Sequence, residues 1–274
     1  MSDASEPVAP REAIADVRIR VPTRGNRKLE ALLAAVNADD QVKAWWHMSA
    51  VNATRRLGMS DHSWVHVQIV VNIALRLARL LFRRGVRPSV AVDHGMSERD
   101  AEVVIAAGAL FHCVGMQIHR ADHEAYSLFL TADKLGELLG GIYEEPERSV
   151  IAAEAMHAII GHRRRGEPFT IEAGIVRVAD ALDMARGRSR VPFEAGQQNI
   201  HSLSAYAIEE VKISAGRGDK PVRVEILMSN SAGIFQVDEL LATKLRGSGL
   251  EEQIEVVARI DAEHEKRLVP VFHI

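Results

Sequence analysis

Cysteine is almost absent from this sequence, which contains one cysteine among 274 residues. A single thiol excludes an internal disulfide framework and fits a reducing compartment, so we expect a cytoplasmic protein. The first ten residues are polar and acidic and contain no apolar segment, so we expect no secretory signal peptide there.

Long hydrophobic runs are also missing. The longest apolar stretch, residues 69–82, is interrupted by Asn72, Arg76 and Arg79, and it is shorter than the ~20 residues that a membrane span needs. The formal net charge is −3, so no overall positive field indicates a nucleic-acid partner. Hydrophobic residues make up 47% and charged residues 26%, which is typical of a protein with a buried core and is compatible with a homo-oligomer.

The helical part of the chain follows a polar start. Residues 1–25 are predicted to form an N-terminal tail, within which the alternation of Val17–Val21 indicates a short strand. Residues 26–195 show helical spacing of apolar residues, and a linker at residues 93–95 precedes Ser97, which has the sequence of a helix N-cap. The helices predicted after residue 26 cover about 28–38, 39–57, 62–82, 97–110, 124–141, 147–163 and 170–186.

The pattern changes in residues 196–274, which we predict to form a small α+β domain. Ala207–Ser214 and Val222–Met228 alternate as strands do, Phe235–Leu245 has helical spacing, and Ile254–Ile260 alternates again. The order is therefore strand, strand, helix, strand. The predicted fold class is mainly α, with this ββαβ module at the C-terminus.

Histidines are concentrated in the helical part, where eight of the 12 lie between His62 and His162. His112 ends an otherwise apolar helix, and His119 and His123 are four residues apart. Asp180 places a carboxylate inside another apolar helix. Imidazoles and carboxylates that converge from several helices typically build a site for one or two ions of Fe, Mn, Co or Zn. Each histidine taken singly could equally be a core or surface residue, so the prediction depends on the set.

Five segments resemble, in order and spacing, the motifs of the HD-domain superfamily of metal-dependent phosphohydrolases. The first begins at His66, the second is an apolar run that ends in His112, and the third is a His-Glu pair before a serine. The fourth contains a histidine, and the fifth is an Ala-Asp pair. These segments are 66–74, 109–116, 123–127, 158–163 and 178–183.

The resemblance implies a helical bundle of the HD type with five metal ligands. Those ligands are His66, His112, His123, His162 and Asp180. His157 and His119 are alternative ligands. His119, Arg120, Arg163 and Arg186 lie beside the motifs and could contact a phosphate, although a solvated face explains such arginines equally well. Asp180, His119 and Arg120 are the candidate catalytic residues.

Cys113 is the main departure from the family pattern, because the residue after the second histidine is an aspartate in the family. A thiolate is a good ligand for zinc or iron but cannot offer two oxygens. The site could hold one metal and still hydrolyse, or use the thiolate as a ligand with a different metal preference. It could also have lost hydrolysis, with Cys113 as a buried core residue.

The leading hypothesis is a metal-dependent phosphohydrolase that acts on a nucleotide or another small phosphate ester, with metal-bound hydroxide as the nucleophile. The alternative is a catalytically degenerate protein that binds a nucleotide, a phosphate or a protein partner. A di-iron oxygenase-type activity is a third hypothesis that the resemblance allows.

Overall fold

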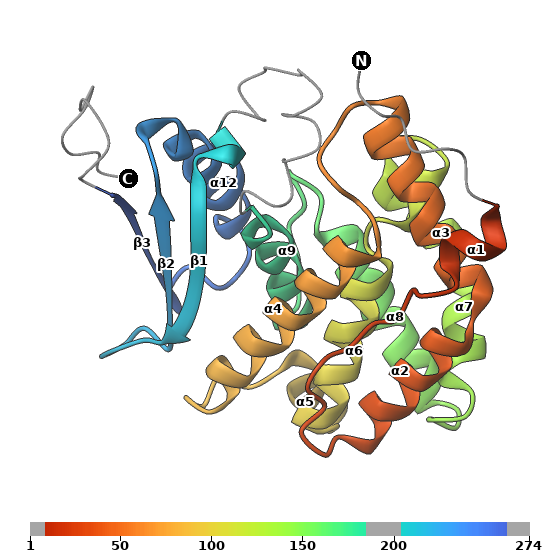
Figure 1. Cartoon of the computed structure of the whole chain (residues 1–274). Helices are drawn as coiled ribbons and strands as arrows, with labels where there is room; N and C mark the ends of the chain where they lie inside the picture. The colour runs from red at the N-terminus through yellow and green to blue at the C-terminus, as the bar shows by residue number, and fades with distance from the viewer. Residues whose placement is uncertain (1–8, 185–203, 262–274) are drawn as a thin grey trace.

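The computed structural model describes residues 9–184 and 204–261. A bundle of helices occupies the N-terminal part, and a small sheet lies against one side of it (Figure 1). The helical part contains α1 (Pro10–Ile14), α2 (Arg27–Ala38), α3 (Asp40–Ala50), the π-helical η1 (Val51–Arg56), α4 (Trp64–Phe82), α5 (Ser89–His94), α6 (Glu98–Phe111), the 3-10 helix η2 (Val114–Gln117), α7 (His123–Leu139), α8 (Glu147–Gly161) and α9 (Ile171–Leu182). The C-terminal part contains β1 (Ile208–Ala215), β2 (Val222–Met228), the 3-10 helix η3 (Ser231–Gly233), the π-helical η4 (Gln236–Ala242), α12 (Thr243–Leu245) and β3 (Ile254–Ile260).

Side-chain caps begin several of these helices. Asn26 accepts the backbone N–H of Leu29 at the start of α2, and Asp39 caps α3 in the same way. Ser97 and Asp100 form a reciprocal capping box on α6, as the sequence of this N-cap predicts. Capped helix starts fix where each apolar face begins, and these faces meet in the interior of the bundle.

Helix α6 is the centre of the bundle and packs against α2, α4, α8 and α9. Its residues from Val103 to Phe111 are all buried, so the helix is apolar on every side, as its sequence indicates. A central helix of this kind places the residue that follows it, His112, deep inside the protein. His112 is only 1% exposed.

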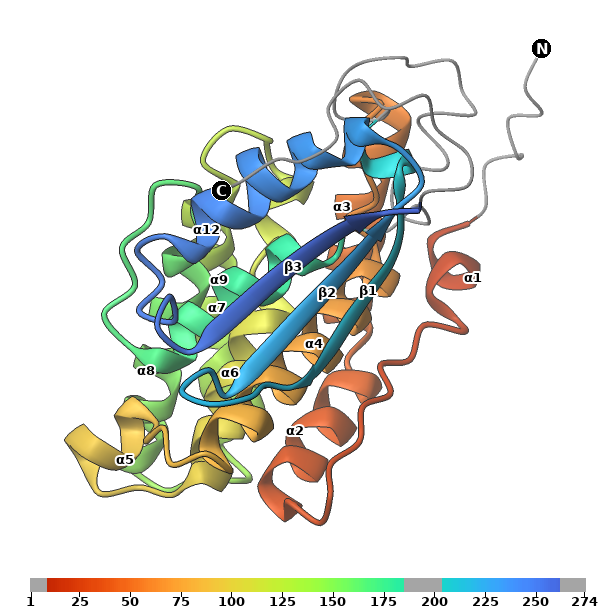
Figure 2. The same ribbon diagram turned by 90° about the vertical axis from the view of Figure 1, so that its left-hand side faces the viewer.

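The C-terminal module has the predicted ββαβ order. Strand β2 lies between β1 and β3, pairing antiparallel with β1 and parallel with β3. The parallel pairing requires a crossover, which η3, η4 and α12 provide. Figure 2 shows the three strands side by side in front of the helices, and the sheet contacts α4 while η4 and α12 contact α9. The mainly α fold class with its small α+β module is confirmed.

Three local predictions differ from the structure. Val17–Val21 forms no strand, because this segment runs along the bundle, where the side chain of Asn37 bonds both backbone groups of Ile19. The predicted linker at residues 93–95 contains the end of α5, and the helix predicted to reach residue 57 changes to a π-helix at Val51. The predicted domain boundary at residue 195 lies outside the described residues.

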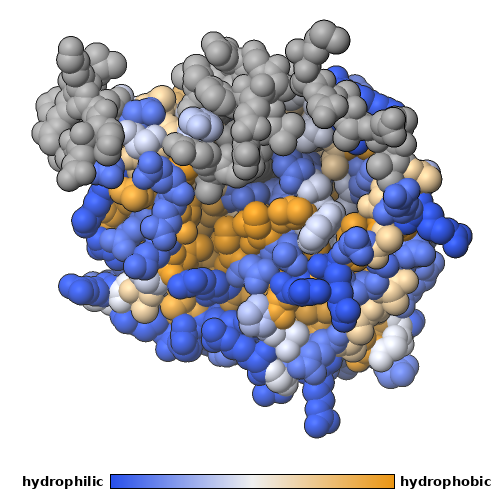
Figure 3. Space-filling model, viewed as in Figure 1, coloured by the Kyte–Doolittle hydropathy of each residue, from blue (hydrophilic) through white to orange (hydrophobic). Residues whose placement is uncertain are grey.

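Helix α4 is the one described helix that is long and apolar enough to cross a membrane, with a mean hydropathy of 1.6. Its most apolar window is 67% buried inside the protein, as in the core helix of a globular fold. Val65 and Ile69 of this helix remain partly exposed, at 41% and 39%. Figure 3 shows hydrophobic residues across the middle of the face on which α4 lies, bordered by hydrophilic ones.

Candidate metal centre

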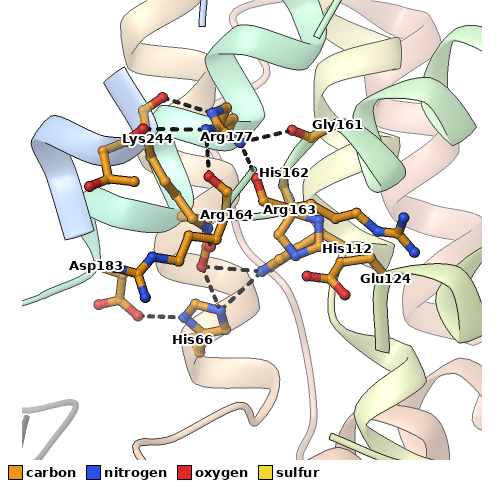
Figure 4. A network of polar contacts seen from close by, with 12 residues as sticks. His66, His112, Glu124, Gly161, His162, Arg163, Arg164, Arg177, Asp183 and Lys244 are labelled. Carbon is orange, nitrogen blue, oxygen red and sulfur yellow. Dashed lines mark hydrogen bonds and ion pairs between the residues drawn. The ribbon is translucent and has the colours of Figure 1, made fainter. Parts of the chain in front are cut away.

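Three side chains from three helices meet at the centre of the bundle. His66 of α4 and His112 at the end of α6 bring their Nε2 atoms to 3.1 Å from each other. Asp180 of α9 places Oδ1 at 3.5 Å from both of these nitrogens. Figure 4 shows the imidazoles of His66 and His112 directed toward each other. Three of the five predicted ligands, at positions 66, 112 and 180, thus lie together.

The other nitrogen of each ring is held by an acceptor. His66 Nδ1 donates to Asp183 Oδ2 at 2.6 Å, and His112 Nδ1 donates to the carbonyl oxygen of Ala109 at 2.8 Å. His162 Nδ1 donates to the carbonyl oxygen of Ile159 at 2.5 Å. Carbonyl and carboxylate oxygens fix the proton on Nδ1, so Nε2 of the neutral ring carries a lone pair. This arrangement of ring partners is typical of metal-binding histidines.

The donor atoms fit a transition-metal ion. Bonds of about 2.1 Å to a single ion place neighbouring ligands about 3.0 to 3.4 Å apart in octahedral or tetrahedral geometry. The separations of 3.1 and 3.5 Å among His66, His112 and Asp180 are close to this range. Two Nε2 lone pairs that face each other would repel, so the two nitrogens share either a proton or a cation. The residues therefore fit a divalent metal.

Cys113 completes this first donor group. Its ligand atom and those of His66 and His112 all lie within 4.8 Å of one another, and all three residues are buried. Although burial of the ring opposes protonation, the neighbouring Cys113 and Asp180 raise the pKa of His112 to about 10. The group therefore favours a positive charge at its centre, whether that charge is a proton or a metal ion.

A second donor group lies next to the first and contains His123, Glu124 and His162. Their ligand atoms also lie within 4.8 Å of one another. Burial lowers the pKa of His123 to about 4, against the pull of Glu124 and with the help of Arg120. Burial, together with the nearby charges of His112 and Lys244, holds the pKa of His162 well below its ordinary value. Both rings are therefore neutral at pH 7, which is the form that binds metal.

The glycine of the second motif brings the two donor groups together. A Cβ on Gly115 would lie 1.9 Å from the carbonyl oxygen of His123, so only glycine allows α7 to approach this closely. The Ser127 hydroxyl accepts the N–H of Gly115 at 2.8 Å and lies 3.1 Å from the carbonyl oxygen of His112. This contact holds His123 and Glu124, at the start of α7, close to His112. The ring centroid of His112 also lies 5.0 Å from that of His162.

Three residues of the site were not predicted as site residues from the sequence. Asp183 orients His66, Glu124 belongs to the second donor group, and Lys244 of α12 forms an ion pair with Asp180. Glu124 and Asp183 lie inside the motif segments 123–127 and 178–183, so the sequence contains acidic side chains there that indicate a place in the site. Lys244 lies 64 residues after Asp180, in a module without a catalytic motif, and the sequence contains no signal for this contact.

The remaining predicted residues lie at the edge of the site or outside it. His157 stacks on Phe169 with ring centroids 4.9 Å apart and accepts its backbone N–H, away from both donor groups. His119 is exposed, and its Nδ1 accepts the N–H of Ala121. Arg120 is exposed too, but its Nη1 donates to His123 Nδ1 at 3.2 Å. Arg163 is half-buried beside His162, and Arg186 lies outside the described residues.

Comparison with known proteins agrees with this geometry. The family model of the HD domain matches residues 60–185, which contain both donor groups. An uncharacterized protein of the archaeon Methanocaldococcus jannaschii is 38% identical over 223 residues, covering 81% of this chain and 86% of that protein. No solved structure matches the chain. The chain therefore belongs to the HD-domain family, a family of metal-dependent phosphohydrolases.

Proposed function

We propose that this protein hydrolyses a nucleotide or another small phosphate ester at the site formed by the two donor groups. The observation that carries the proposal is the pair of Nε2 atoms 3.1 Å apart, with Asp180 3.5 Å from each. Asp183 and two backbone carbonyls hold the rings in this orientation. A divalent metal held there would supply Lewis-acid chemistry to a phosphate ester.

The protein's own groups perform three tasks in this proposal. His66, His112 and Asp180 provide the first set of ligand atoms, and His123, Glu124 and His162 provide an adjacent set. The acceptors at Nδ1 of His66, His112 and His162 keep the Nε2 lone pairs of these three rings directed at the centre, so little reorganisation is needed when a cation enters. Arg120, exposed beside His123, offers a positive charge at the open edge of the site, where a phosphate would arrive.

Elemental analysis of protein purified without added metal, run beside a hydrolysis screen of nucleotides and phosphomonoesters, tests the proposal. We expect one or two ions of Fe, Mn, Co or Zn per chain and activity that a chelator abolishes. Asp180→Ala removes a ligand, so we expect turnover to fall at least about hundredfold with the helices intact. Asp133→Ala, at an exposed position of α7, is the matched control and should leave turnover unchanged. Unchanged turnover in Asp180→Ala would contradict the proposal.

A second candidate function is binding of a nucleotide or phosphate without hydrolysis. The observation that favours it is Cys113, which is 1% exposed and stands where the family has an aspartate. Measurable nucleotide binding with no product in the parent, and product formation in Cys113→Asp, would support this function. Turnover in the parent that exceeds turnover in Cys113→Asp would contradict it.

A further inference from the structure

The C-terminal module contributes one positive charge to the metal centre. Lys244, on the short helix α12, forms an ion pair through Nζ with Oδ2 of Asp180, and both side chains are largely buried, at 14% and 13% exposed. The other oxygen of Asp180 faces His66 and His112. The ammonium group therefore lies one carboxylate away from the first donor group. Figure 4 shows Lys244 reaching toward the histidines from the side opposite α7.

The position of Lys244 is fixed by Arg177, a guanidinium only 2% exposed. Arg177 Nε donates to the carbonyl oxygen of Lys244 at 2.8 Å, and its Nη2 donates to that of Thr243 at 3.3 Å. The same guanidinium bonds the carbonyl oxygens of Arg163 and Arg164, which directly follow His162 (Figure 4). One buried side chain thus joins α12 to the loop that carries His162, and this holds the lysine at a defined place.

The ion pair with Lys244 makes Asp180 a weaker metal ligand, which favours a further role for the lysine. Asp180 donates electron density more strongly to a metal when no cation competes for its oxygens, so the ion pair weakens the ligand. An ammonium group has three N–H donors, and the ion pair with Asp180 engages one of them. Lysine is a compact point charge that commonly binds phosphate.

We propose that Lys244 is a catalytic residue that binds the phosphoryl group of the substrate and neutralises its charge, while it stays paired with Asp180. The inference rests on the proposed function, because it uses the same site. Both parts of the chain then contribute to the active site. The helices supply the ligand atoms, and the ββαβ module supplies the phosphate-binding cation.

Binding of inorganic phosphate to the metal-loaded protein, measured by calorimetry beside metal content, tests this inference. Lys244→Met removes the charge, and Lys244→Gln removes it while keeping a hydrogen-bond donor for Asp180. We expect both variants to bind phosphate about tenfold to hundredfold more weakly than the parent, which is the effect of one charge-assisted hydrogen bond. Their metal content and melting temperature should stay close to those of the parent. Lys212→Met, at an exposed position of β1, is the control and should bind phosphate as the parent does.

Lys244→Gln keeps the inference testable if Lys244→Met does not fold. Parent-like phosphate affinity in Lys244→Gln overturns the inference, as does a loss of phosphate binding that only follows a loss of metal. A parent that binds no phosphate overturns it too. Lys244-dependent phosphate binding without hydrolysis of any ester would overturn the proposed hydrolysis and leave this role of Lys244 standing. Hydrolysis by the parent, together with parent-like phosphate binding in both Lys244 variants, would overturn the role of Lys244 and leave the proposed hydrolysis standing.

Discussion

Asp183 orients His66, a candidate metal ligand, without being a candidate ligand itself. Its carboxylate accepts from His66 Nδ1 at 2.6 Å, and this hydrogen bond sets the ring orientation and the position of the proton. Asp183→Asn offers a weaker acceptor and can also present its amide N–H₂ to the ring. We expect metal affinity to fall about tenfold to hundredfold. Competitive titration with a chromophoric chelator measures the change, and Asp133→Asn on exposed α7 serves as the control. Equal affinity in parent and Asp183→Asn would contradict the prediction.

Cys113 provides a second test at the residue scale. Its ligand atom lies within 4.8 Å of those of His66 and His112, so the thiolate can bind the same ion as the two imidazoles. We expect the Co(II)-loaded protein to show a thiolate-to-metal charge-transfer absorption and Cys113→Ser to lack it, because a hydroxyl is a poor ligand for a soft site. An identical spectrum in the two proteins would mean that Cys113 only fills space.

The sequence was informative about those residues whose motifs were local. The resemblance predicts His66, His112, His123, His162 and Asp180 as a set of ligands, and the structure places these five side chains in two adjacent groups. Neighbours of these residues were harder to assign, because a sequence does not show which of two acidic side chains points inward. Lys244 could not be found at all, since its role depends on a tertiary contact between two modules.

At the scale of elements, the start of α6 depends on Asp100. This carboxylate accepts from Lys28 Nζ at 2.7 Å, from Tyr143 Oη at 2.8 Å and from the hydroxyl of Ser97 at 2.7 Å. Burial raises the pKa of Asp100, but the hydrogen bonds from Lys28, Ser97 and Tyr143 outweigh it, so the pKa lies below its ordinary value. The folded protein therefore binds this proton more weakly than the unfolded chain does.

It follows that Asp100 stabilises the fold fully above the unfolded pKa of about 4, and that this stabilisation is lost as the pH falls through the lower pKa of the folded state. Asp100→Asn should cost about 1 to 3 kcal/mol of the free energy of unfolding at pH 7. The difference between parent and variant should shrink when the pH is lowered below about 4. Urea unfolding of both proteins across this range measures it, and a difference that does not change with pH would contradict the assignment.

Elements in which periodicity coincides with caps or turn signals were predicted close to their real bounds, whereas the strand predicted at Val17–Val21 is absent. Strands β2 and β3 match their predicted ranges, Val222–Met228 and Ile254–Ile260, because alternation and turn signals coincide there. Val17–Val21 also alternates, but no neighbouring strand pairs with it in the part of the chain that the structure describes. The alternation of Val17–Val21 therefore comes from the burial of one side of an extended segment, on which Val17 and Ile19 face the helices.

At the scale of the whole molecule, the helices and the ββαβ module share one hydrophobic core. The buried apolar residues of β1 and β2 belong to the same cluster as those of α4 and α9. The contact between the two parts is close, since a Cβ on Gly174 of α9 would lie 2.1 Å from the carbonyl oxygen of Ser248. Docking of the module against α9 is also what brings Lys244 to Asp180.

Two helical glycines allow this docking to be tested. Gly174→Ala places a methyl group against the Ser248 carbonyl, so we expect a loss of about 1 to 3 kcal/mol in the free energy of unfolding, as in an overpacked core. Gly136→Ala in α7 gains the same helix propensity but meets no atom within 4 Å, so it should be neutral or stabilise by up to about 1 kcal/mol. Chemical unfolding of the two variants compares them directly. Equal stability would show that the module does not pack on α9 as described, and Lys244 would then lose its place beside Asp180.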